Sequence, residues 1–169
     1  EQLFLNNSPA AAVTALNKFI GKYPKSVKIP AAYFYLGECH SKLGKMQQAA
    51  DAYLEVMKSP SGSFTELATR NYAAIQYDLE QYSNAVDAYM SLYDIAQIEK
   101  NRLDAQKWLT WAFYKNKQYR NAVVQSDKVL ANKAFNESVY TDAKYVKALS
   151  HLALGERAEA LLLLEELSV

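Results

Sequence analysis

Cysteine is almost absent from this chain of 169 residues: Cys39 is the single one, which excludes an internal disulfide framework. Glycine and proline are also scarce, with five and four residues, and this disfavours an all-β chain with its many tight turns. Long hydrophobic runs are missing too. Runs such as residues 31–36 and 160–164 are far shorter than the ~20 residues that cross a bilayer. We therefore expect no direct insertion into a membrane.

An excess of charge of one sign is lacking as well. The chain carries 19 Lys and Arg against 18 Asp and Glu, which gives a formal net charge of +1. Dedicated nucleic-acid binders normally have a basic excess, so we expect no nucleic-acid partner. What the chain does have is apolar material: half of its residues are hydrophobic, enough for a substantial core.

Small residues recur along the chain at a nearly constant interval. Three of them lie within residues 30–60, and successive steps of 36, 37 and 38 residues lead from each to another small residue. The three series are Ala32, Ala68, Ala105, Ala143; Gly37, Ala73, Thr110, Ala148; and Ala49, Ala85, Ala122, Ala160. A period of this length is typical of stacked helical hairpins, which approach closely where side chains are small.

Apolar periodicity and the Pro, Gly and Asn positions predict the helices. They are expected at 9–23, 28–43, 46–58, 64–79, 82–96, 102–115, 119–131, 136–154 and 156–167, with a break at Asn101 and the last turns of another helix at 1–6. No hairpin can bury both of its apolar faces alone, so neighbouring hairpins must stack. The sequence thus predicts an all-α, right-handed α-solenoid of antiparallel helical hairpins.

The predicted solenoid is a single array over residues 1–169 with about four to five repeats. A partial first repeat occupies 1–27, and further repeats occupy 28–60, 61–98, 99–133 and 134–169.

The repeat resembles the tetratricopeptide repeat (TPR) family. The residues that match its spacing are Tyr33, Leu36, Gly37, Gly44, Ala49, Tyr53 and Pro60 in one repeat, Tyr82, Ala85 and Tyr89 in the next, and Tyr119 and Ala122 in the one after. Departures are Thr110 at a Gly/Ala position, Lys147 at the position of Leu36, and repeats longer than the usual length. Residues 19–26, FIGKYPKS, are similar to the bacterial cell-envelope branch of the family, which implies a periplasmic or envelope location.

One face of the first helix of each repeat is not needed for the small-residue contacts. In the family this face lines a concave groove. The groove residues expected here are Phe34, Glu38, Arg70, Tyr77, Lys107, Trp111, Tyr114 and Tyr145. Aromatic residues and Arg dominate binding hot spots, which favours a protein-binding groove; the alternative is that the rings only pack between repeats.

Sites for chemistry are not indicated. The stretch 37–45, GECHSKLGK, resembles a phosphate loop only superficially, because six residues separate its glycines and Met46 follows the lysine. His40 and His151 occupy equivalent places three repeats apart, which favours packed rings over metal ligands. Cys39 is expected to be a small core residue rather than a reactive thiol. We therefore expect no enzyme, no cofactor and no metal.

The predicted function is a non-enzymatic scaffold for protein–protein interaction that binds a peptide or helix of a partner in the concave groove. The alternative is a structural segment of a larger repeat protein, whose groove is filled by its own chain or by a second copy. The last helix, ERAEALLLLEEL, is apolar around much of its circumference. We therefore also expect further repeats in the native protein or a homodimer through this C-terminal helix.

Overall fold

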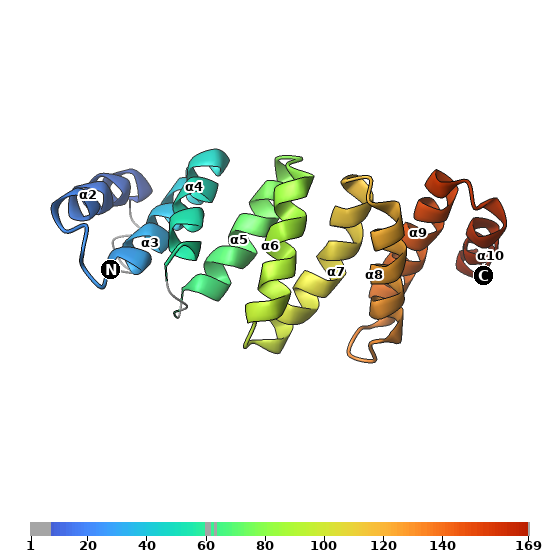
Figure 1. Cartoon of the computed structure of the whole chain (residues 1–169). Helices are drawn as coiled ribbons and strands as arrows, with labels where there is room; N and C mark the ends of the chain where they lie inside the picture. Colours follow the sequence, from blue (N-terminus) through green and yellow to red (C-terminus); the bar gives the residue numbers. More distant parts are fainter. Residues whose placement is uncertain (1–7, 60–61, 63, 169) are drawn as a thin grey trace. The chain divides into compact units, whose positions relative to one another are not determined.

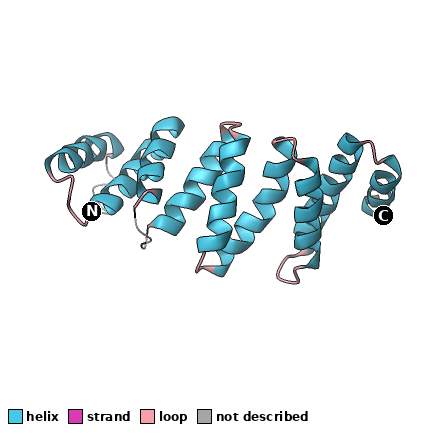
Figure 2. Ribbon diagram, viewed as in Figure 1, coloured by secondary structure: helices cyan, strands magenta, loops and turns pink. Residues whose placement is uncertain are grey.

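The computed structural model describes residues 8–59, 62 and 64–168, and every regular element among these residues is an α-helix (Figures 1 and 2). The helical turns predicted at 1–6 lie outside the described residues. The chain divides into two compact units, Glu1–Leu79 and Glu80–Val169. The boundary falls in the turn of the predicted repeat 61–98.

The first unit contains four described helices, coloured blue to light green in Figure 1. They are α2 (Pro9–Lys22), α3 (Ile29–Lys42), α4 (Met46–Met57) and α5 (Thr65–Asp78). Each helix packs against the next one along the chain: α2 against α3, α3 against α4, and α4 against α5. This is the succession that stacked hairpins require.

The second unit contains five helices among its described residues. They are α6 (Tyr82–Ile95), α7 (Glu99–Lys115), α8 (Tyr119–Ala131), α9 (Glu137–Leu154) and α10 (Arg157–Leu167). Again each packs against its successor, and α7 also contacts α9. The first helices α7 and α9 of neighbouring repeats therefore lie close together, and their side chains can form a common surface.

Two of the described helices, α2 and α9, start at side-chain caps that are visible in the sequence. The Ser8 side chain accepts a hydrogen bond from the backbone N–H of Ala11, and Pro9 occupies the first turn of α2. The Asn136 side chain likewise accepts from the N–H of Val139 at the start of α9. Both caps occupy donors that the first turn of a helix leaves without a partner.

The turn between the two helices of a hairpin uses one left-handed residue. Gly44 and Gly155 have φ angles of 71° and 81°, and Glu80 and Lys117 both have 59°. These four positions are related by the same steps of 36, 37 and 38 residues as the small-residue series. The backbone geometry of the turn is thus repeated, with glycine at only two of the four positions.

The small-residue series mark buried positions, as predicted. All twelve members are buried, and six of the seven members from Ala49 to Ala122, all except Thr110 at 2%, are 0% exposed. At Gly37 the approach is closest, because a Cβ atom there would lie 2.6 Å from Cε1 of Tyr53. The prediction of an all-α helical repeat is confirmed by these contacts and by the absence of strands from the described residues.

One predicted boundary is wrong. The expected break at Asn101 lies inside α7, which begins at Glu99, and Asn101 is only 2% exposed. The helix begins earlier because extended backbone at Ile98 provides the N-cap and Glu99 places a carboxylate in the first turn, where the helix dipole favours it.

Candidate protein-binding surface

Phe34 was predicted to line the groove, and this prediction is wrong. Its side chain is only 9% exposed and belongs to the core of the first unit. The ring lies 5.0 Å from that of Phe64 and 5.9 Å from that of Tyr53, measured between centroids. Phe64 precedes α5 and covers Phe34. The helical spacing that predicted Phe34 in the groove therefore marks a packed core position instead.

Glu38 lies at the centre of a hydrogen-bond network that joins three helices of the first unit. Its Oε1 accepts from the hydroxyl of Tyr53 at 2.5 Å and from Nδ2 of Asn71 at 2.9 Å. Burial, and then the hydrogen bond and charge of Glu38, raise the pKa of Tyr53 far above its usual range. Glu38 therefore ties α3 to α4 and α5.

Arg70 and Tyr77 lie two turns apart on α5, and both side chains are half-buried. The Arg70 guanidinium donates to Oδ1 of Asn71 at 3.3 Å, so it adjoins the network of Glu38. Glu38, Arg70 and Asn71 thus form a polar group on the first helices of the first unit.

In the second unit, four aromatic side chains form what we call the aromatic cluster: Trp111, Tyr114, Tyr119 and Tyr145. The Trp111 ring lies 6.2 Å from Tyr114 at 83°, an edge-on arrangement, and 6.3 Å from Tyr145. The Tyr119 ring lies 5.7 Å from that of Tyr114, and Tyr119 was not among the predicted groove residues. Tyr145 is 44% exposed, while the other three are half-buried. The rings hold one another in place while part of their surface remains open to solvent.

Lys107 lies one turn before Trp111 on α7. Its ammonium group stands 5.4 Å from the ring centroid of Trp108, within the range of a cation–π contact. The side chain also borders a small cavity between α7 and α9 that Trp111 and Asp142 line. A cation thus lies one helical turn from Trp111 of the aromatic cluster.

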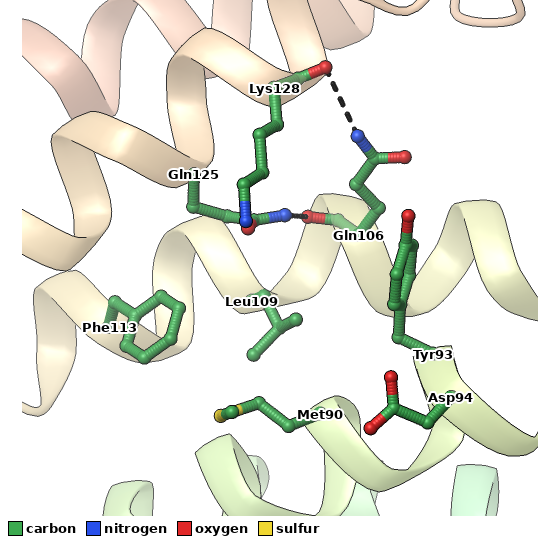
Figure 3. Close-up of a pocket in the computed structure, with 8 residues that line it drawn as sticks. All are labelled: Met90, Tyr93, Asp94, Gln106, Leu109, Phe113, Gln125 and Lys128. Atoms are coloured by element: carbon green, nitrogen blue, oxygen red, sulfur yellow. Dashed lines mark hydrogen bonds between the residues drawn. The ribbon is translucent and has the colours of Figure 1, made fainter.

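A pocket that the sequence analysis missed lies on the other side of α7. It has a volume of about 240 Å³ and is formed by three helices of the second unit (Figure 3). Its lining residues are Met90, Tyr93 and Asp94 of α6, Gln106, Leu109 and Phe113 of α7, and Gln125 and Lys128 of α8. The sequence signal was a single glutamine, Gln125, at a position where the other repeats have Ala52, Ala88 and Leu163. The pocket was missed because its lining comes from second helices as well as from a first helix.

The groups that could carry chemistry are packed instead. The thiol of Cys39 is 0% exposed, and burial raises its pKa, which disfavours the reactive thiolate. His40 is 9% exposed, and its Nδ1 has no hydrogen-bond partner in the described part of the chain. His151 contacts a carboxylate oxygen of Glu156 through Nδ1 at 2.7 Å. Among the residues described, no three His, Cys, Asp or Glu side chains are grouped to hold a metal ion.

No helix in the described ranges combines the length and apolarity needed to span a lipid bilayer. The helices, their order and their pairwise packing define an α-helical repeat solenoid. Residues 2–26 and 31–60 match the model of the tetratricopeptide repeat. This match identifies tetratricopeptide repeats in that part of the chain, and a solved structure of TPR-like repeats shares the fold of the described residues. Such repeats generally serve as non-enzymatic interaction scaffolds.

Several solved structures share this fold. MamA (41-end) from Desulfovibrio magneticus RS-1 is 15% identical with a TM-score of 0.66, over 99% of this chain and 88% of that chain. A kinesin light chain of nearly identical TPR-like repeats from Podosopora anserina is 20% identical with a TM-score of 0.65, over 96% and 87%. BtubC from P. vanneervenii is 14% identical with a TM-score of 0.63, over 92% and 70%. These identities show the fold alone. No curated protein matches the sequence significantly.

Proposed function

We propose that the chain is a non-enzymatic scaffold that binds an extended peptide or a helix of a partner protein in a concave groove lined by its first helices. The observation that carries this proposal is the aromatic cluster on α7, α8 and α9. Its rings are fixed by mutual contact, yet Tyr145 remains 44% exposed. Aromatic anchors of this kind dominate the energy of protein interfaces.

The fixed rings also reduce the entropy lost on binding, because few rotamers remain to be ordered. Lys107 adds a positive charge beside the rings, and it suits an acidic or backbone-carbonyl group of the partner. In the first unit, Arg70 and Tyr77 are the predicted groove residues that keep a half-exposed position, while Phe34 is part of the core.

The test uses tryptophan fluorescence. The sequence contains two tryptophans, and Trp108→Phe leaves Trp111 as the only reporter. We expect peptides selected from a displayed random library for binding to the chain to shift the Trp111 emission saturably. Tyr145→Ala should weaken the same peptides roughly thirtyfold, in the range of a hot-spot residue. Selected peptides that leave the emission unchanged would place binding elsewhere on the chain.

We further propose that the protein works in a bacterial cell envelope. The support is the similarity of residues 19–26, FIGKYPKS, to the envelope branch of the family. Fractionation of the source cells, with detection of the native protein by an antibody, tests this proposal. Recovery with cytosolic markers alone would contradict it.

A second candidate function is a structural segment covered by a second copy or by further repeats. The observation in its favour is α10, where Leu161 and Leu162 are 57% and 63% exposed. The experiment is sedimentation of the chain with and without Leu163→Lys, which places a charge on the half-buried edge of this surface. A dimer that dissociates on this substitution supports the candidate; a monomer in both cases contradicts self-association.

A further inference from the structure

The pocket between α6, α7 and α8 has an apolar floor and a rigid far wall. Leu109 is 5% exposed, and Figure 3 shows its side chain directed toward Met90, with Phe113 at one end. The wall on α8 is held to α7 by two side-chain amides. Nε2 of Gln125 donates to the backbone oxygen of Gln106 at 2.8 Å. Nε2 of Gln106 donates to the backbone oxygen of Lys128 at 3.1 Å.

A third amide completes this attachment, since Nδ2 of Asn132 donates to Oε1 of Gln106 at 3.0 Å. Gln106 and Gln125 are 7% and 6% exposed. Each amide nitrogen already donates one hydrogen bond between the two helices, so both side chains are held in place and shape the pocket. The concavity is therefore preformed, which favours binding.

Charged groups of opposite sign stand on opposite walls of the pocket. Asp94 belongs to α6 and Lys128 to α8, and both residues are exposed. In the part of the chain that the structure describes, neither side chain forms an ion pair within 4.0 Å. A ligand that complements the pocket needs an apolar centre, a cation toward α6 and an anion toward α8.

The volume of the pocket limits the size of the ligand that it can hold. At about 240 Å³ the pocket is smaller than the ~300–1,000 Å³ usual for cofactors and drug-sized molecules, and it has room for one large side chain. We propose that this pocket is a second protein-docking site, which takes one Phe or Leu side chain of a partner segment. A basic residue of that segment pairs with Asp94 and an acidic residue pairs with Lys128.

This site is separate from the aromatic cluster. Gln106, Leu109 and Phe113 lie on one side of α7. Lys107, Trp111 and Tyr114 lie about 130° further around the helix, because a helix turns about 100° per residue. The second unit can therefore hold two partner segments at once, one on each side of α7.

The experiment uses seven-residue capped peptides with a central Phe, flanked by Lys on one side and Glu on the other, in both orders. Binding is followed by amide chemical shifts of the ¹⁵N-labelled chain. We expect one order to shift the amides around Met90, Leu109 and Gln125, and Phe→Ala in the peptide to weaken binding roughly thirtyfold. In the double variant Asp94→Lys with Lys128→Glu, the preferred order should reverse.

Trp111→Ala with Tyr114→Ala is the matched control and should leave this peptide binding unchanged, so failure of the groove and failure of the pocket are distinguishable. The proposal is overturned if neither peptide order shifts the pocket amides at millimolar concentration. It is also overturned if free phenylalanine binds as tightly as the better peptide, which would assign the pocket to a small molecule, or if the charge exchange leaves the preferred order unchanged.

Discussion

At the scale of single residues, the closest helix contact depends on the lack of a side chain at Gly37. A Cβ there would meet three ring atoms of Tyr53 at 2.6–2.9 Å, and this ring is 1% exposed and hydrogen-bonded to Glu38. The sequence identified the position through its repeat spacing. It could not identify the partner ring, because spacing locates a contact without stating which side chain fills it.

Gly37→Ala should therefore lower the free energy of unfolding by about 1–3 kcal/mol, since the Tyr53 ring must move within a packed core. Gly21→Ala is the control: nothing lies within 4 Å of a Cβ at Gly21, and alanine favours the helix there. Urea unfolding of both variants measures the difference. Equal midpoints for Gly37→Ala and the wild type would show that the contact is loose.

The left-handed turn residues lead to a stabilising substitution. Lys117 has φ of 59°, a conformation that costs a non-glycine residue roughly 1–2 kcal/mol. Lys117→Gly should raise the free energy of unfolding by up to about 1 kcal/mol, after the greater freedom of glycine in the unfolded chain is subtracted. Gly155→Ala makes the opposite change at an equivalent turn position and should lower the free energy of unfolding. A lower melting temperature for Lys117→Gly would contradict this account of the turn.

His40 should make stability depend on pH. Burial, and then the charge of Lys45, lower the pKa of His40 below 6.5, while the unfolded state keeps the ordinary value. Between these two pKa values the unfolded chain binds the extra proton, so stability falls as the pH decreases through about 6.5. The control is His40→Phe, since Phe113 occupies the equivalent place. Unfolding at pH 5 to 8 should show a shallower decline for the variant; identical profiles would contradict the assignment.

At the scale of elements, most helix boundaries were predictable because Ser, Pro, Asn and Gly act locally on the backbone. The start of α7 was not, since Asn101 is a poor helix former by itself but is buried by tertiary packing at 2% exposure. The attachment of α8 to α7 was also invisible in the sequence. It depends on glutamine and asparagine amides whose partners lie 19 to 26 residues away.

Gln106→Leu tests this attachment. The substitution leaves the backbone oxygen of Lys128 and the amide of Asn132 without their partner, and each lost partner costs about 1–3 kcal/mol. We expect a lower melting temperature, with faster hydrogen exchange concentrated in α8. Gln47→Leu, which removes an exposed amide that donates to Asp51, is the control. Uniform exchange along the chain would contradict a local role.

At the scale of the whole molecule, the repeat was predictable because small residues recur along the sequence at a nearly constant interval. The match of residues 2–26 and 31–60 to the family model agrees with this. The binding surface stays a prediction. Helical spacing assigned Trp111, Tyr114 and Tyr145 to it, and their rings lie next to one another, but the same spacing also assigned the core residue Phe34 to it. Burial depends on what a neighbouring segment contributes, and Phe64 covers Phe34 from outside the helix that carries it. The pocket was missed because three helices build it.

The central claim is that the aromatic cluster binds a partner segment without being needed for the fold. The measurement is the affinity of the library-selected peptides for Trp111→Ala with Tyr114→Ala, read beside its circular dichroism and melting curve. We predict a helical spectrum, a cooperative transition and loss of peptide binding. Unchanged affinity in a folded variant, or a variant that no longer folds, would contradict the claim and leave these rings as structural residues.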